Sequence, residues 1–198
     1  MFTMGTPLRG NPPGTTWNPA DKGASVVLSN ANRDATGGIS VRAIASASSG
    51  KKYFEILVVS TAGPNIPRIG IANTDLTTGD RIGDVSYSAA YTHNTGTGLI
   101  YTNGSFLFGG SVPTFTAGDV IGIAVDIDAG KLWFAKNNTW VNDQGGAIGN
   151  PGAGANQRAT ITTGKTYFPA ISAEAWLLRA NFAASDFAYP APSGFVAW

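Results

Sequence analysis

The sequence predicts an all-β protein, an antiparallel β-sandwich of two sheets with about eleven or more short strands. Two observations lead to this fold class. Apolar residues alternate with a period of two along most of the chain, and helix signals are scarce. Glycine, asparagine and aspartate corners interrupt that alternation roughly every eight to twelve residues, as in sandwiches and barrels. With 43% hydrophobic residues among 198, the chain has enough apolar surface for one large core.

Residues 1–16 differ from the rest because they contain several prolines and glycines and no periodic apolar pattern. We therefore predict an extended N-terminal arm over residues 1–16. Two interpretations of the arm stay open, a frayed chain end or a strap that docks onto a neighbouring subunit. Residues 17–198 are expected to form a single sandwich domain.

The clearest predicted strand covers residues 120–127. Its isoleucines and Val125 point to one side, and the other side, with Val120, Gly122, Ala124 and Asp126, is the small face. Residues 52–60 are apolar on both sides after Glu55, which predicts a strand covered on both faces. The remaining predicted strands are shorter: 26–28, 39–45, 68–72, 85–91, 99–101, 105–108, 132–136, 167–173 and 176–182.

Two connections have a recognisable turn chemistry, and a third is unusually long. Asn103 and Gly104 accept the positive φ angles of a two-residue hairpin. Gly130 is expected to take the left-handed position in the turn that follows Asp128. Residues 142–164 are glycine-rich and too long for a hairpin, so they predict an insertion at one end of the sandwich.

Two residues near the 120–127 strand are expected to serve the scaffold. Asp119 stands where a turn enters the strand, and its side chain can accept hydrogen bonds from nearby backbone N–H groups. Gly122 has no side chain, so an aromatic residue of the neighbouring strand, such as Trp133, can lie across it.

The composition excludes several classes of protein. A net charge of +1 gives no long-range field that would attract nucleic acid. Zero cysteines and a single histidine exclude thiolate chemistry and multi-histidine metal sites. No apolar run approaches the roughly 18 residues of a membrane span, and no secretory signal is visible, so we expect a soluble protein without membrane insertion. Only 13% of residues are charged, and an uncharged polar surface suits a protein that is packed beside others or lies outside a cell.

No catalytic constellation is evident, and we predict no enzyme, no cofactor and no metal. A Gly-x-Ser-x-Gly elbow is missing, and His93 lies in a polar turn. The two glutamates, Glu55 on an apolar strand and Glu174 in a turn, form no acid pair of the kind that glycoside hydrolysis needs.

Two weaker motifs, one for phosphate binding and one for Ca²⁺ binding, lack the surrounding residues that each site needs. Residues 164–166 read Gly-Lys-Thr, but the expected earlier glycine is an alanine, and a strand follows where a phosphate-binding loop needs a helix. Asp126 and Asp128 offer oxygens for Ca²⁺, yet the full loop pattern with its terminal glutamate is not there.

Binding is the better candidate activity, because five Trp, six Tyr and ten Phe exceed what a core of this size requires. Trp140 is the first candidate, since exposed tryptophan beside amides such as Asn137 and Asn138 can stack on a sugar or anchor a protein contact. The alternative, that Trp140 closes one end of the core, stays open. Tyr87, Tyr91 and His93 form a second polar and aromatic stretch.

Six segments, taken in order, resemble the SPRY domain, a β-sandwich module called B30.2 in its longer form. They are residues 52–56, 68–72, 118–126, 131–138, 167–172 and 178–182. The flanks 16–22 and 192–198 look like those of SPRY modules that bacteriophages encode in tail and other virion proteins. Two positions depart from the family pattern. Asn138 stands where the family has glycine, a mild change because asparagine tolerates the left-handed conformation, and Ala183 replaces a glycine, which suggests a different local turn.

The resemblance implies a non-catalytic interaction platform whose loops at one end of the sandwich hold a partner. We therefore expect a bacteriophage virion component on the outer surface or tail: an accessory, decoration or tail subunit. Its expected partners are other virion proteins, a second copy of the chain, and a host surface glycan or protein. The alternative is a carbohydrate-binding module for host surface glycans.

Overall fold

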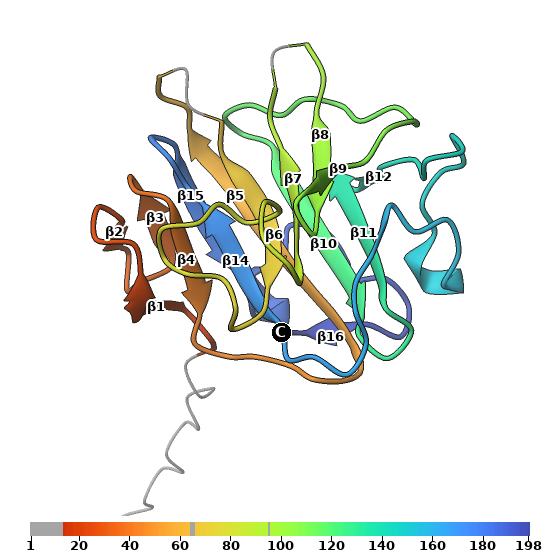
Figure 1. Ribbon diagram of the computed structural model, residues 1–198, viewed down its shortest axis with the longest axis horizontal. Coiled ribbons are helices and arrows are strands. Elements are labelled where there is room, and N and C mark those ends of the chain that lie inside the picture. Colours follow the sequence, from red (N-terminus) through yellow and green to blue (C-terminus); the bar gives the residue numbers. More distant parts are fainter. Residues whose placement is uncertain (1–13, 64–65, 95) are drawn as a thin grey trace, which may run out of the picture.

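The computed structural model describes residues 14–63, 66–94 and 96–198, so the predicted arm lies outside the described residues except for its last three positions. The described chain forms two facing β-sheets (Figure 1), which confirms the predicted antiparallel sandwich. Within these described ranges, regular helix is confined to two single 3₁₀ turns, η1 (Pro151–Ala153) and η2 (Ala184–Asp186). No helix in the described ranges is long and apolar enough to cross a membrane.

The first sheet has seven strands in the order β1-β4-β14-β6-β7-β8-β9, and all neighbours are antiparallel. They are β1 (Trp17–Lys22), β4 (Ser40–Ala43), β14 (Phe168–Ser172), β6 (Arg68–Ala72), β7 (Ser88–Thr92), β8 (Leu99–Thr102) and β9 (Ser105–Phe106). With about 4.8 Å between neighbouring strands, the β1 and β9 edges are roughly 29 Å apart.

The second sheet has the order β12-β11-β10-β5-β15-β3-β2, with β13 beside β11 and a short parallel strand, β16, beside β5. Its strands are β12 (Thr139–Trp140), β11 (Lys131–Lys136), β10 (Val120–Asp126), β5 (Lys51–Ser60), β15 (Leu177–Asn181), β3 (Asp34–Thr36), β2 (Val27–Ser29), β13 (Ala159–Thr160) and β16 (Val196–Ala197).

The main core lies between the sheets and follows the predicted alternation. Ile121, Ile123 and Val125 of β10 point inward and are fully buried, as are Phe54 and Ile56 of the adjacent β5. Facing residues from the seven-stranded sheet complete the cluster: Ile69, Ile71, Ala89, Tyr91 and Ile171. Period-two patterning therefore gave the correct inner face of β10.

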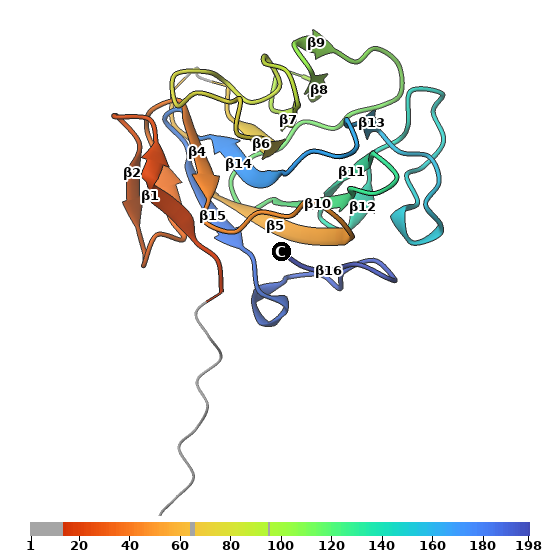
Figure 2. The same cartoon turned by 60° about the horizontal axis from the view of Figure 1, so that its bottom comes forward.

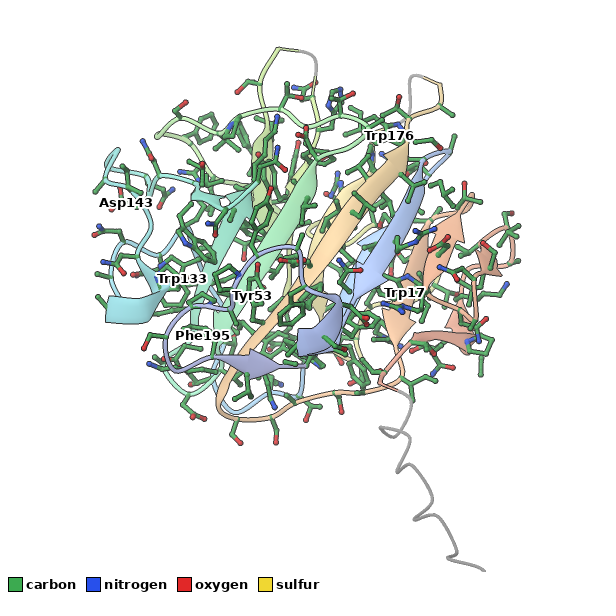
Figure 3. All side chains as sticks on the ribbon, turned by 180° about the vertical axis from the view of Figure 1, so that it is seen from behind. Trp17, Tyr53, Trp133, Asp143, Trp176 and Phe195 are labelled. Atoms are coloured by element: carbon green, nitrogen blue, oxygen red, sulfur yellow. The ribbon has the colours of Figure 1, made fainter. Side chains whose placement is uncertain are left out.

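A second apolar layer covers the outer face of the nine-stranded sheet. The C-terminal segment, residues 183–198, crosses this face, and Figure 2 shows β16 on the side of β5 and β10 away from the other sheet. Phe195 packs edge-on against Trp133, with ring centroids 6.1 Å apart, and Phe187 packs edge-on against Tyr53 at 4.9 Å. Figure 3 shows Tyr53, Trp133 and Phe195 gathered beneath this segment. Both faces of the central strands are thus covered, as predicted for 52–60.

One packing prediction was wrong: Tyr53, not Trp133, lies across Gly122. The register pairs Trp133 with Ala124, whereas Gly122 pairs with Glu55 on β5. A Cβ atom built on Gly122 would come within 2.8 Å of the Tyr53 hydroxyl. The aromatic ring comes from the strand on the other side of β10, and register between strands cannot be read from one strand alone.

The predicted turns are present. Asn103 and Gly104 have φ angles of 49° and 79° between β8 and β9, and Gly130 has a φ of 66°. Asn137 and Asn138 form a second two-residue hairpin with φ angles of 47° and 66°, so asparagine fills the position where the family has glycine. Ala183 has an extended backbone with φ −91°, a conformation that needs no glycine.

Residues 142–164 fold against the side of the sandwich and do not form an open loop. Isolated bridges pair Asn142 with Ile148 and Asn150 with Ala155, and η1 lies between the latter two residues. β13 at the end of the segment pairs with β11. The segment therefore extends the nine-stranded sheet toward β8 and β9 of the other sheet, where β13 lies close to β8.

Candidate functional site

The six predicted binding residues do not form one site. Tyr87 and His93 stand at opposite ends of β7, whose five residues at about 3.3 Å each place them roughly 17–20 Å apart. Asn137, Asn138 and Trp140 share one hairpin, β11–β12, in the other sheet. The structure thus brings together only these last three residues.

Tyr91 is not a surface residue, and its assignment as a binding residue is wrong. Its side chain is fully buried on the inner face of β7, with ring contacts to Phe115 at 5.1 Å and Phe134 at 5.8 Å between centroids. Its hydroxyl donates to the Pro113 carbonyl, and burial raises its pKa. The period of two along β7 directs this side chain inward.

His93 and Tyr87 are half-buried and engaged with neighbours. The His93 ring lies 5.0 Å from Trp176 between centroids, and Nδ1 is 2.7 Å from the Phe115 carbonyl oxygen. The ammonium of Lys165 lies 4.3 Å from the centre of the Tyr87 ring, a cation–π contact. Both side chains are therefore partly occupied by contacts within the fold.

Trp140 is also half-buried. It packs edge-on against Tyr53, with ring centroids 6.5 Å apart, at the margin of the layer beneath the C-terminal segment. Its neighbour Asn138 is exposed at the tip of the hairpin. This position agrees with the alternative in which Trp140 closes the end of an apolar cluster.

Asn137 holds the entrance to β10. Its Oδ1 accepts from the Val120 N–H at 2.8 Å, and its Nδ2 donates to Asp119 at 2.7 Å. The Asp119 carboxylate also accepts from the Thr116 N–H at 2.8 Å, the backbone contact expected from the sequence, and pairs with Lys136 at 3.0 Å. Both ends of the Asn137 amide therefore serve the scaffold, although the residue itself is exposed.

Burial of Asp119 acts to raise its pKa, but the Thr116 N–H, Lys136 and Asn137 outweigh burial and hold the pKa below its usual value. The carboxylate therefore stabilises the fold above the unfolded-state pKa of about 4, and this contribution is lost as the pH falls through the lower folded-state pKa. We expect Asp119→Asn to lower the free energy of unfolding by about 1–2 kcal/mol at pH 7. Urea denaturation at pH 7 and near pH 2 should show the difference from the unmodified protein shrinking in acid. Equal acid sensitivity of the two proteins would contradict this assignment.

A more open aromatic surface lies at the β9 edge of the seven-stranded sheet. Three rings form a row there, Tyr101 on β8, Phe106 on β9 and Phe108 just beyond, which we call the Phe108 patch. Centroids are 5.9 Å apart for Tyr101 and Phe106 and 4.1 Å apart for Phe106 and Phe108. The Arg68 guanidinium lies over the inner end of the row, 4.4 Å from the centre of Tyr101. Phe108 at the outer end is 73% exposed, the highest value among the exposed large hydrophobic residues described.

Arg158 fixes the backbone beside this patch. It is 2% exposed, and its terminal nitrogens donate to the carbonyls of Gly109 at 2.7 Å and Leu107 at 3.1 Å. The Gln144 amide donates to the Phe108 carbonyl at 3.2 Å from the neighbouring 142–148 loop. Three consecutive carbonyls are therefore held by side chains from the 142–164 segment.

Two shallow hollows flank the Phe108 patch. One, of about 160 Å³, lies among Thr97, Leu99 and the Phe106–Phe108 turn, and the other, of about 90 Å³, lies among Gln144, Gln157 and Thr160. Arg158 and Leu107 line both hollows. Aromatic rings, hydroxyls and amides thus meet at one edge, a set of groups suited to binding. No group of three or more metal-binding side chains occurs in the described parts of the chain.

Sequence reasoning missed the Phe108 patch, although part of its signal was present. Pairing across the Asn103–Gly104 turn puts Tyr101 opposite Phe106, and Phe108 two positions later follows the same side. Residues 105–108 were expected to be one strand, but β9 ends at Phe106. Nothing in the sequence ties Arg158 to this edge, because that contact spans about fifty residues.

The family model of the SPRY domain matches residues 51–183. The chain belongs to the SPRY domain family. Its fold is similar to crystal structures of the TRIM65 PSpry domain (TM-score 0.62, 15% identity, covering 85% of this chain and 92% of that one) and of the SPRY domain of human HERC1 (0.57, 14%, 83% and 96%). A crystal structure of a human SPRY domain is also similar, with a TM-score of 0.53 and 18% identity over 79% of this chain and 94% of that one. No curated protein sequence matches significantly. At these identities the solved structures establish the fold alone.

Proposed function

We propose that this SPRY domain protein is a non-enzymatic component of a bacteriophage virion, an accessory, decoration or tail subunit that binds neighbouring virion proteins. SPRY domains are in general interaction modules and not enzymes. The flanks 16–22 and 192–198, which resemble those of phage-encoded modules, support the virion assignment. A surface with few charges is consistent with a protein packed among others.

The observation that carries this proposal is that apolar side chains stay exposed at one edge of the sandwich, although the outer faces of both sheets are covered by other parts of the chain. Loop 73–87 packs over the seven-stranded sheet, and the C-terminal segment packs over the other sheet. Val27, on the three-residue edge strand β2, is nevertheless 59% exposed, and Ile44, just after β4, is exposed as well. Strands β2 and β4 lie on the side where the described chain begins (Figure 1), toward the sheet edges opposite the Phe108 patch. These exposed side chains support a proposal in which this edge attaches to the particle and the Phe108 patch faces outward.

Antibody labelling of purified particles by negative-stain microscopy tests this function. We expect label on the virions, and we expect a Val27→Asp, Ile44→Asp double variant to lose its association with particles, because burying two carboxylates at an interface is costly. A Phe108→Ser variant, at the opposite edge, serves as the matched control and should still be incorporated. Unlabelled virions would refute the virion assignment.

A further inference from the structure

The Phe108 patch presents an aromatic face that the fold itself does not need. Phe106 is half-buried and its ring contacts Phe108 at 4.1 Å, whereas Phe108 leaves 73% of its surface in water. Leaving a Phe side chain exposed forgoes roughly 1.5–3 kcal/mol of burial energy, so the ring contributes little to folding. Neighbouring rings of the row are tilted by 36° and 50°, so the platform is the exposed Phe108 ring itself, on which the C–H face of a pyranose ring can stack.

The groups around this platform are neutral hydrogen-bonding groups. Thr97 and Thr160 supply hydroxyls, and Gln144 and Gln157 supply amides, to the two hollows. Hydroxyl and amide groups both donate and accept, as the hydroxyls of a sugar do. No acidic residue lines either hollow within the described chain. The lining therefore matches a ligand with many hydroxyls and no net charge.

Arg158 does not turn the site into an anion site. Both of its terminal nitrogens already donate to the carbonyls of Gly109 and Leu107, and only 2% of the residue reaches solvent. Burial lowers the pKa of Arg158, while the nearby charge of Asp143 acts in the opposite direction and already offsets part of the positive charge. Arg158 acts as a positioning residue that holds the backbone under Phe108.

The same contacts argue against a peptide that would add as a further strand. The carbonyls of Leu107, Phe108 and Gly109 are all occupied by Arg158 or Gln144, and β9 is only two residues long. A strand that docked here would find almost no free backbone ladder. Hollows of about 160 and 90 Å³ are also smaller than the roughly 300 Å³ and above that encloses a compact small molecule. A chain that lies across the edge fits better than a ligand buried within it.

We propose that the Phe108 patch is a binding site for a neutral oligosaccharide, with one sugar stacked on Phe108 and adjacent hydroxyls reaching into the two hollows. This is a binding activity beyond attachment to the virion, and it places sugar recognition at the β9 edge instead of at Trp140. The backbone under the ring is fixed in advance by Arg158, which reduces the ordering cost of binding.

A glycan array displaying multivalent neutral oligosaccharides of hexoses and N-acetylhexosamines, with sialylated and sulfated glycans as charged comparators, tests the site on the full chain. We expect saturable binding to at least one neutral oligosaccharide. Phe108→Ser should weaken it about tenfold or more, whereas Phe108→Trp should retain it, because a stacking ring remains. Since Phe108 is exposed, thermal melting of the Ser variant should match that of the unmodified protein.

Two controls separate this site from its alternatives. Val196→Ser removes an apolar side chain of comparable exposure from β16 and should leave binding unchanged. Trp140→Ala should also leave it unchanged. A blank array, binding confined to the charged glycans, or binding that Trp140→Ala abolishes and Phe108→Ser does not would each overturn the proposal. So would capture of a virion protein through Phe108 with no glycan bound. Particle labelling is measured separately, so either proposal can fail alone.

Discussion

Replacing Glu55 with alanine is expected to lower the free energy of unfolding by roughly 3–5 kcal/mol. Glu55 lies on β5 with no exposed surface, on the face that the C-terminal segment covers. Its carboxylate accepts from the backbone N–H groups of Ala188 at 2.7 Å and Tyr189 at 3.0 Å. The Tyr53 hydroxyl at 3.0 Å and the Asn181 amide at 3.3 Å complete its partners. Four donors thus converge on one buried side chain.

The size of this effect comes from the hydrogen-bond donors that the substitution leaves without an acceptor. Without the carboxylate, two backbone N–H groups of the C-terminal segment and two buried side chains lose their acceptor, and unpaired buried donors cost about 1–3 kcal/mol each when water cannot reach them. Partial detachment of residues 183–198 would let water reach these donors, which limits the total loss of stability. Phe187 and Phe195 would then lose their contacts with Tyr53 and Trp133.

Urea denaturation of Glu55→Ala measures the loss of stability, and limited digestion with chymotrypsin reports detachment through cleavage after Phe187 and Phe195. Glu55→Gln keeps one acceptor oxygen and should lose less. Asp186→Asn is the matched control, because its pair with Arg33 at 2.6 Å is about one-third exposed and contributes less than about 1 kcal/mol. A loss below 1 kcal/mol for Glu55→Ala would show that the segment is held by its aromatic contacts alone.

How well the sequence predicts an element of this fold depends on how far apart along the chain the interacting residues are. Each of the eleven expected strands corresponds to a strand of the structure, because alternation and turn residues are local signals. The strands that were missed have weak local patterns: β1 contains Pro19 and charges, while β3, β12, β13 and β16 have two or three residues each. These short strands exist because a longer neighbour pairs with them.

The functional surface was harder to predict for the same reason. Trp140 and Tyr91 stood out by residue type, but exposure is decided by what packs on them, Tyr53 in one case and Phe115 with Phe134 in the other. Glu55 was expected to lie on an apolar strand, and it does, yet its role depends on N–H groups more than 130 residues away. Contacts at this separation leave no trace in local periodicity.

Gly70→Ala is expected to be the most damaging of the small substitutions, with a loss of at least about 3 kcal/mol or no folded protein at all. Gly70 lies in the middle of β6, paired with Ala90 on β7 and Ala170 on β14. A Cβ atom added there would overlap the Ala89 carbonyl oxygen and lie 3.0 Å from the Ala90 Cα. These are backbone atoms of a hydrogen-bonded neighbour, so they cannot move aside without breaking the ladder.

The position also explains why this face of the sheet is built from small residues. Ala72, Ala90 and Ala170 surround Gly70 and form a cluster with Leu76 and Ile82, which come from the loop that covers the sheet. A methyl group at Gly70 would therefore disturb the close packing between strands that this loop covers.

Gly152→Ala provides the matched control in the same protein. Gly152 lies in η1, has no positive φ, and a Cβ atom there would meet nothing closer than 3.8 Å. This substitution should leave the free energy of unfolding within about 0.5 kcal/mol, or raise it slightly through the lower entropy of the unfolded chain. The urea denaturation midpoints of the two variants, followed by circular dichroism at the β-sheet signal, test both predictions. Equal stability of the Gly70 and Gly152 variants would mean that β6 and β7 can separate locally, against the close backbone approach seen between them.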